Sequence, residues 1–281
     1  MNQTSIRQIL TEHGLAPSKR LGQNFLVQPR LAEQIVALAG IGPTDTVVEL
    51  GVGLGSLTIP LAARAGKVIG IEIDAGIIRY HLEAQDLPVN VELHHQDLLQ
   101  TDFAALAHDQ GSRLKIIANL PYAITNPLLF KLVEQHQALD LAVLMVQKEV
   151  ALRLIAPPGT KEYGVLSVLL GSCAQVRRLL EVGPANFYPR PKVDSLVIAI
   201  SFGAAPAGVD FPMLRRVVDL AFRQRRKTLL NSLSAGGAIG LGRPEAARAL
   251  AAAGIEPRLR AENLTTADFI RLTRAIAAAQ D

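Results

Sequence analysis

Between residues 46 and 146, short apolar runs alternate with segments of helical periodicity, and this alternation limits the possible folds more than any other feature. Buried strands are predicted at 46–50, 68–73, 89–94, 114–118 and 141–146. Helices are predicted between them, at 56–65, 75–83, 103–108 and 126–135. Strands connected through helices form a parallel sheet with helices on both faces, so we expect an α/β protein.

Two further predicted strands, at 175–182 and 193–202, are joined by a proline-rich loop. Because no helix separates them, we expect antiparallel pairing at the sheet edge and seven strands in all. A linker follows at 204–208, and the remaining pattern is only helical, at about 211–233, 243–253 and 265–279. We therefore predict a large domain over residues 1–202 and a small all-helical domain over residues 209–281.

The composition excludes several classes of protein. Apolar residues make up 49% of the chain and charged residues 19%, which is typical of a globular protein. No apolar run reaches the ~18 residues of a membrane span, and the polar N-terminus has no signal-peptide core. The single cysteine, Cys173, cannot form an intrachain disulfide. We expect a cytoplasmic protein without a membrane partner.

A glycine-rich loop follows the first predicted strand, where residues 49–56 read Glu-Leu-Gly-Val-Gly-Leu-Gly-Ser. Glycines at alternate positions, including Gly51 and Gly53, let the backbone approach a ligand at a helix N-terminus. Glu72 ends the second strand, where an acid binds ribose hydroxyls, and Asp97 follows the third, where it can accept a bond from an adenine amine. Each feature alone also occurs for structural reasons, but together they predict an S-adenosylmethionine pocket.

Residues 119–122 read Asn-Leu-Pro-Tyr, directly after the apolar run 114–118. The side-chain oxygen of Asn119 and a backbone carbonyl beside Pro121 can accept both N–H bonds of an adenine amine and turn its lone pair toward an electrophile. The Tyr122 ring can stack on the base. The simpler interpretation is a strand-to-helix turn with a surface tyrosine.

With these motifs the chain resembles the KsgA-type rRNA adenine N6-dimethyltransferases, which modify two adjacent adenines near the 3′ end of small-subunit (16S) rRNA. The resemblance covers nearly the whole chain and includes the segments 22–26, 147–150, 163–164, 187–195 and 221–227. It implies a seven-stranded Rossmann-like class I methyltransferase domain that uses S-adenosylmethionine. The implied partner is 16S rRNA in the assembling small ribosomal subunit, and we expect the enzyme to act as a monomer.

The resemblance also implies roles for individual residues. Cofactor contacts are expected at Asn24, Leu26, Gly51, Glu72, Asp97 and Asn119, to which the glycine loop adds Gly53. Catalytic contacts to the base are expected at Asn119, Leu120, Pro121 and Tyr122, with Phe187 on the other side of the base. Without the resemblance, packing on the sheet edge is the better interpretation of Phe187. Val52 and Ala123 replace the Pro and Asn common in the family, and neither carries a predicted role.

Charges are unevenly distributed along the chain, with six cations and one acid between Arg215 and Lys227. Such a run can be a solvated helix face, but its imbalance favours a phosphate-binding surface. RNA binding is therefore predicted for Arg223, Arg225, Arg226 and Lys227. No metal is expected, because the adjacent His94 and His95 point to opposite faces of a strand and cannot chelate one ion together.

Two other functions share some of these features. The erythromycin-resistance 23S rRNA methylases use the same Asn-Leu-Pro-Tyr chemistry, although the segments 191–195 and 222–227 favour the small-subunit enzymes. A binding protein, such as an rRNA assembly factor or a transcription cofactor, can keep this fold without activity. The complete set of Glu72, Asp97 and Asn119 argues against lost catalysis.

Overall fold

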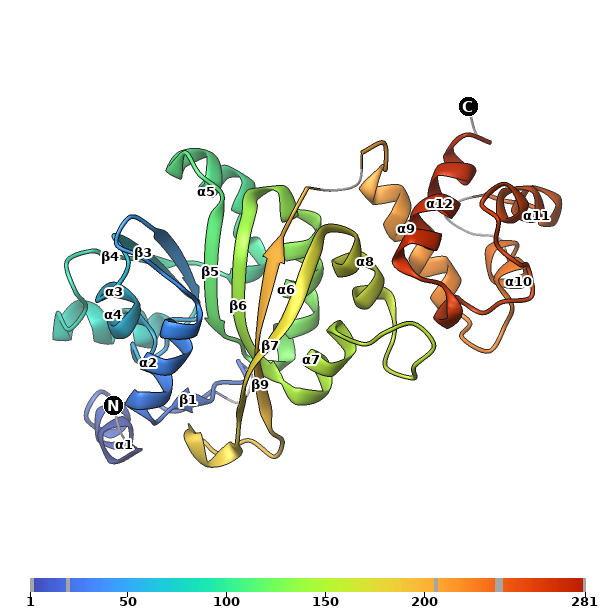
Figure 1. The fold of residues 1–281 in the computed structure, drawn as a ribbon. Coiled ribbons are helices and arrows are strands. Elements are labelled where there is room, and N and C mark those ends of the chain that lie inside the picture. Colours follow the sequence, from blue (N-terminus) through green and yellow to red (C-terminus); the bar gives the residue numbers. More distant parts are fainter. Residues whose placement is uncertain (1–2, 19–20, 205–206, 236–239, 280–281) are drawn as a thin grey trace. The chain divides into compact units, whose positions relative to one another are not determined.

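The computed structural model describes residues 3–18, 21–204, 207–235 and 240–279, and they form two compact units (Figure 1). The sheet unit contains the chain up to Ala151 together with Arg177–Phe202. The helical unit contains Leu152–Val176 and the chain from Gly203 onward. The second segment of the helical unit thus begins directly after residue 202, and the sequence predicts a domain border at this position. The earlier segment 152–176 also belongs to the helical unit, although the sequence prediction placed it in the first domain.

A seven-stranded sheet forms the centre of the fold, as predicted, with the strand order β4-β3-β2-β5-β6-β9-β7 (Figure 1). Its strands are β2 (Thr46–Leu50), β3 (Lys67–Glu72), β4 (Val91–His95), β5 (Leu114–Asn119), β6 (Leu139–Gln147), β7 (Ala174–Val182) and β9 (Ser195–Phe202). The five strands from β2 to β6 pair in parallel. Strand β9 runs antiparallel to β6 and lies next to the edge strand β7, so the two predicted edge strands are neighbours.

The central strands are buried on both faces, which explains their continuous apolar sequences. Helices α2 (Pro29–Leu38) and α3 (Thr58–Ala62) supply Ile35 and Leu61 to a core cluster that also contains Val47 and Ile117 of the sheet. The other helices of the sheet unit are α1 (Gln3–Glu12), α4 (Ala75–Ala84), α5 (Phe103–Gln110) and α6 (Thr125–Glu134), and α7 (Lys148–Leu154) follows β6. Three of the short 3-10 helices of this unit are η1 (Leu98–Gln100), η2 (Tyr122–Ile124) and η3 (His136–Ala138).

A second, two-stranded sheet was not predicted. Strands β1 (Phe25–Leu26) and β8 (Phe187–Tyr188) pair antiparallel, with Phe25 opposite Tyr188 and Leu26 opposite Phe187. The turn η4 (Pro184–Asn186) precedes β8, and the backbone N–H of Val27 donates to the carbonyl of Asn186 over 2.9 Å. The pairing fixes the N-terminal segment beside the carboxyl ends of the central strands.

Five helices pack together in the helical unit: α8 (Val165–Cys173), α9 (Phe211–Phe222), α10 (Leu229–Leu233), α11 (Arg243–Ala252) and α12 (Thr266–Ala277). The Phe222 and Phe269 rings stack with centroids 5.8 Å apart, and the Tyr163 ring meets Phe222 edge-on at 6.1 Å. The predicted continuous helix over 211–233 is wrong, because residues 223–228 form turns between α9 and α10. In the described part of the chain, the helices are too short or too polar to cross a membrane.

Candidate active site

A cavity in the sheet unit lies at the carboxyl ends of β2, β3 and β5, where open α/β sheets bind ligands. Every residue predicted to contact the cofactor lines this cavity: Asn24, Leu26, Gly51, Gly53, Glu72, Asp97 and Asn119. Leu120, Pro121 and Tyr122 line it as well. The structure therefore brings together side chains from four strand ends and from the N-terminal segment around β1.

The glycine loop has a backbone conformation that requires glycine. Gly51, Gly53 and Gly55 have φ angles of 83°, 53° and 79°, in the left-handed region where side chains are disfavoured. The backbone N–H of Gly53 donates to the Glu72 carboxylate over 2.9 Å. The acid at the end of β3 therefore fixes the loop at the end of β2.

Glu72 organises the backbone around it as well as facing the cavity. Its carboxylate accepts hydrogen bonds from the N–H groups of Gly53, Ile73 and Asp74, at 2.8–2.9 Å. Burial nevertheless raises the pKa of Glu72, since desolvation outweighs these three bonds. An ionised carboxylate can accept about four hydrogen bonds, so Glu72 retains capacity for one ligand hydroxyl.

The amide of Asn119 is oriented by a contact that sequence reasoning did not predict. Its Nδ2 donates to the backbone carbonyl of Asn24 over 2.9 Å. The Asn24 side chain in turn donates to the carbonyl of Gly22 over 3.1 Å, which folds the segment before β1 on itself. Because the nitrogen of Asn119 is engaged, its oxygen is the atom available to accept a bond from a ligand in the cavity.

The neighbouring groups of this segment are also held in place. The Tyr122 hydroxyl lies 2.8 Å from the Ser195 hydroxyl, and burial raises the pKa of Tyr122. The carbonyl of Pro121 accepts from the Thr125 hydroxyl at 3.1 Å. Of the carbonyls beside Pro121, that of Leu120 is therefore the better candidate to accept from a base. A fixed ring, amide and carbonyl form a site for a flat molecule with an N–H donor.

Asp97 is the N-cap of the 3-10 helix η1 and follows the end of β4. One of its carboxylate oxygens accepts from the backbone N–H of Leu99 over 2.9 Å. The cap fixes the side chain and leaves the second oxygen to bind a ligand amine. Asp97, Glu72, the glycine loop and Asn119 thus meet in one cavity, at the ends of the neighbouring strands β4, β3, β2 and β5.

Comparison with known proteins agrees with this geometry. The family model described as ribosomal RNA adenine dimethylase matches residues 15–278. The chain belongs to this family. Two relatives named ribosomal RNA small subunit methyltransferase A are similar to it over 95% of this chain and 94% of their own length. They come from Desulfotalea psychrophila, at 49% identity, and Magnetococcus marinus, at 46% identity.

Solved structures show the same fold. A dimethyladenosine transferase from Plasmodium falciparum is similar with a TM-score of 0.73 and 27% identity, over 88% of this chain and 95% of that chain. The 23S rRNA methyltransferase ErmE is similar with a TM-score of 0.65 and 24% identity, over 90% of this chain and all of that chain. The likeness to ErmE concerns the fold alone.

Several residues line the cavity without a role assigned from sequence, and two of them, Phe25 and Glu49, have distinctive surroundings. Phe25 lies against the glycine loop, because a Cβ atom at Gly53 would come within 3.3 Å of its ring. Glu49, at the end of β2, is 1% exposed, and burial raises its pKa to about 8. The Thr58 hydroxyl lies close enough to oppose this shift slightly but outside hydrogen-bond geometry. In the sequence, the one signal that could have identified Glu49 is its position just before the glycine loop.

The two departures from the family pattern have different surroundings. Val52 is buried and packs over Gly70 of β3, where a Cβ atom would lie 2.6 Å from a Val52 methyl group. The Val52 side chain thus fills the space that a side chain at Gly70 would need. Ala123 lies in η2 directly after Tyr122, and the backbone of this turn comes close to Gly22.

The structure does not bring Phe187 to the cavity lining. The ring is 3% exposed, and it belongs to the core cluster that also contains Leu26, its partner in the β1–β8 pairing. Its surroundings in the described residues match the packing interpretation. The stacking role of Phe187 stays a prediction, and it requires the ring to turn out of this core.

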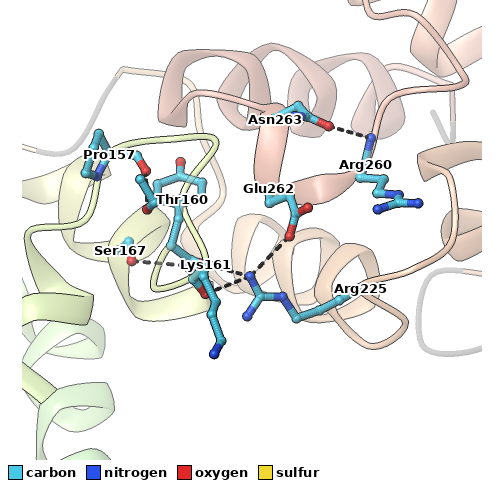
Figure 2. Close-up of polar contacts among 10 residues, drawn as sticks. Pro157, Thr160, Lys161, Ser167, Arg225, Arg260, Glu262 and Asn263 are labelled. Carbon is cyan, nitrogen blue, oxygen red and sulfur yellow. Dashed lines mark hydrogen bonds and ion pairs between the residues drawn. The ribbon is translucent and has the colours of Figure 1, made fainter. Parts of the chain in front are cut away.

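The predicted RNA-binding cations lie in the turns after α9 and not on a helix. Arg223, Arg225, Arg226 and Lys227 are all exposed, and they differ in their contacts. Arg225 differs, because its guanidinium donates to the carbonyl of Lys161 at 2.9 Å and pairs with Glu262 at 3.1 Å (Figure 2). Arg225 therefore links the loop before α8 to the turn η5 (Ala261–Asn263). Its predicted contact to an RNA phosphate would be additional to this link.

The two adjacent histidines make separate contacts. The Nε2 atom of His94 lies 2.6 Å from the Glu92 carboxylate, and that of His95 lies 3.2 Å from the carbonyl of Ile73. Within the ranges that the structure describes, there is no group of three or more His, Cys, Asp or Glu residues arranged to hold a metal.

The buried Glu49 generates a testable prediction about pH and stability. Its pKa is about 8 in the folded protein and 4.5 ordinarily, so the folded state binds this proton more tightly than the unfolded state. The stabilisation is complete below pH 4.5 and is lost as the pH rises toward 8, by up to about 1.4 kcal/mol per pH unit. Glu49→Gln, which resembles the neutral acid, should flatten the decline of Tm in this window.

The control is Glu181→Gln, at an exposed carboxyl whose pKa is lowered by its bond to Lys148. It should leave the decline of Tm between pH 4.5 and 8 unchanged. A decline as steep in Glu49→Gln as in the native protein would mean that Glu49 is already ionised in the folded state.

Proposed function

We propose that this enzyme transfers methyl groups from S-adenosylmethionine to N6 of two adjacent adenines near the 3′ end of small-subunit rRNA, and dimethylates each. One observation carries the proposal, the Asn119 amide fixed by the Asn24 carbonyl at the end of β5. A rigid acceptor oxygen beside a cavity lined by the glycine loop, Glu72 and Asp97 suits an exocyclic amine more than a hydroxyl or carbon nucleophile. Membership of the adenine dimethylase family supports the same reaction.

The chemistry follows from the groups around the amine. The lone pair of adenine N6 is conjugated with the ring, so the amine is a poor nucleophile. When Asn119 Oδ1 and the Leu120 carbonyl accept its two N–H bonds, the lone pair can turn out of the ring plane toward the sulfonium methyl. N6 then bonds to the methyl carbon, the carbon–sulfur bond breaks, and S-adenosylhomocysteine leaves. The N6 proton passes to solvent or to a neighbouring carbonyl.

Orientation supplies most of the catalysis in this proposal. Holding two reactants in a reactive geometry can lower the barrier by about 7–11 kcal/mol. Asn119 and Tyr122 are both hydrogen-bonded to other parts of the sheet unit before any base arrives. The second transfer starts from a monomethylated amine with a single N–H, so it depends even more on this fixed geometry.

The cavity supports the cofactor assignment in its details. The glycine loop would lie against the methionine part of S-adenosylmethionine, Glu72 would bind the ribose hydroxyls, and Asp97 would accept from the adenine amine. Each of these acids keeps acceptor capacity beyond its bonds to the backbone. S-adenosylmethionine supplies the electrophilic methyl group, and the residues here orient it.

Two alternatives, a 23S rRNA methylase and an inactive binding protein, have less support than a small-subunit enzyme. Relatives at 46–49% identity bear the name small subunit methyltransferase, whereas the likeness to ErmE is 24% and shows the fold alone. The complete set of Glu72, Asp97 and Asn119 at one cavity favours a catalyst over an inactive binding protein. We infer a catalyst that acts on the assembling small subunit in the cytoplasm.

A direct assay tests this function. Labelled S-adenosylmethionine is supplied with unmethylated small subunits, large subunits or free rRNA, and the products are mapped by mass spectrometry. We expect two adjacent N6,N6-dimethyladenines near the 3′ end of 16S rRNA. Modification of 23S rRNA alone, or of no RNA, would contradict the proposal.

The exposed cations of the helical unit generate a prediction about RNA binding. Arg223, Arg226 and Lys227 crowd one set of turns, and the structure shows no ion pair for them within the described residues. If all three contact phosphates, neutralising them should reduce the log–log salt slope of RNA binding by about two to three units. S-adenosylmethionine affinity, measured by calorimetry, should stay unchanged.

Arg225 provides the matched comparison. Arg225→Gln removes one charge of the same run but also the contacts to Lys161 and Glu262 (Figure 2). We expect a lower Tm and a slope change of at most about one unit, since one phosphate contact is at stake. A triple variant with an unchanged slope would leave Arg223, Arg226 and Lys227 as ordinary solvated surface.

A further inference from the structure

Behind the glycine loop lies a buried histidine that the proposed reaction does not use. His81, in the last turn of α4, is 3% exposed. Its Nε2 atom lies 2.8 Å from the carbonyl oxygen of Gly53, and its Nδ1 atom lies 2.7 Å from a carboxylate oxygen of Asp86. The other oxygen of Asp86 accepts from the Tyr80 hydroxyl at 2.9 Å.

These contacts determine where the protons are. A carbonyl oxygen can only accept, so Nε2 of His81 carries a proton and donates it to Gly53. Burial and the Asp86 carboxylate raise the pKa of Tyr80 to about 12, so its hydroxyl stays a donor to Asp86. The Nδ1 atom of His81 is held by the Asp86 carboxyl group at 2.7 Å. His81 therefore bridges Asp86 and the glycine loop.

The peptide groups of Gly53 are held from two sides. Its N–H is bound by Glu72 at 2.9 Å, and its carbonyl is bound by His81 at 2.8 Å. The Phe25 ring lies on a third side, and a Cβ atom added at Gly53 would come within 3.3 Å of this ring. The φ angle of Gly53 is 53°, a conformation that a free glycine shares with many others. The contacts select this one from the alternatives.

We propose that His81 is a positioning residue for the cofactor, which it affects through the carbonyl of Gly53 without touching the ligand. The inference rests on the proposed function, because it takes the cavity as the S-adenosylmethionine site. A loop fixed before binding loses little conformational freedom when the cofactor arrives. His81 thus strengthens cofactor binding and leaves the methyl-transfer step itself unchanged.

The test compares His81→Leu with His81→Gln, whose side-chain amide can still donate to the Gly53 carbonyl. Binding of S-adenosylmethionine is measured by calorimetry without RNA, and kcat is measured at saturating cofactor. For His81→Leu we expect the Kd to rise about tenfold, near the upper end of the effect of losing one hydrogen bond, with kcat within about twofold of the native value. His81→Gln should recover most of the affinity.

The control is His94→Leu, which removes a partly exposed histidine of the same unit that lies outside the cavity lining, and it should change neither quantity. A folded His81→Leu variant with native Kd would overturn the inference, as would a loss confined to kcat. If the native protein itself fails to bind S-adenosylmethionine, the proposed function fails instead.

A measurement on the native protein covers the case in which His81→Leu does not fold. Nitrogen-15 NMR of the histidine rings should show a proton on Nε2 of His81 that is protected from exchange. An Nε2 atom without a proton, or with a rapidly exchanging proton, would overturn the inference without any substitution.

Discussion

The hydrogen bond from the Asn119 amide to the Asn24 carbonyl is the interaction on which the site depends. It joins the end of a central strand to a segment 95 positions earlier in the chain, and it decides which atom of the amide is free. Without it, the amide can rotate and present its nitrogen, a donor, to the amine whose N–H group it accepts in the proposed reaction. The small β1–β8 sheet matters because it holds that N-terminal segment in place.

Buried titratable groups are concentrated around the glycine loop. Glu72 binds its N–H side, His81 binds its carbonyl side, and the buried Glu49 lies at its start. Burying such groups costs free energy that apolar residues would not cost. The pattern is expected of a binding site, where backbone geometry is fixed in advance by groups that stability alone would not select.

Much of the fold was predictable from sequence, because buried parallel strands are continuous apolar runs and their connections are helical. Strand-end residues such as Glu72 and Asn119 could be predicted to meet, because parallel strands end at one edge. The β1–β8 pairing and the Asn24 contact were not, since both join segments distant in sequence and leave no periodicity. The break after Phe222 was missed because no Pro or Gly marks it. The binding of Arg225 to a distant loop is equally invisible in a charge run.

Asn119→Asp in single-turnover methyl transfer tests the central claim most directly. Aspartate keeps the acceptor oxygens but cannot donate to the Asn24 carbonyl, so it separates orientation from acceptor strength. With saturating S-adenosylmethionine and unmethylated or monomethylated small subunits, we predict a rate loss of about 100-fold or more, close to that of Asn119→Ala. A near-native rate for Asn119→Asp on both substrates would contradict the account, because an acceptor alone would then suffice.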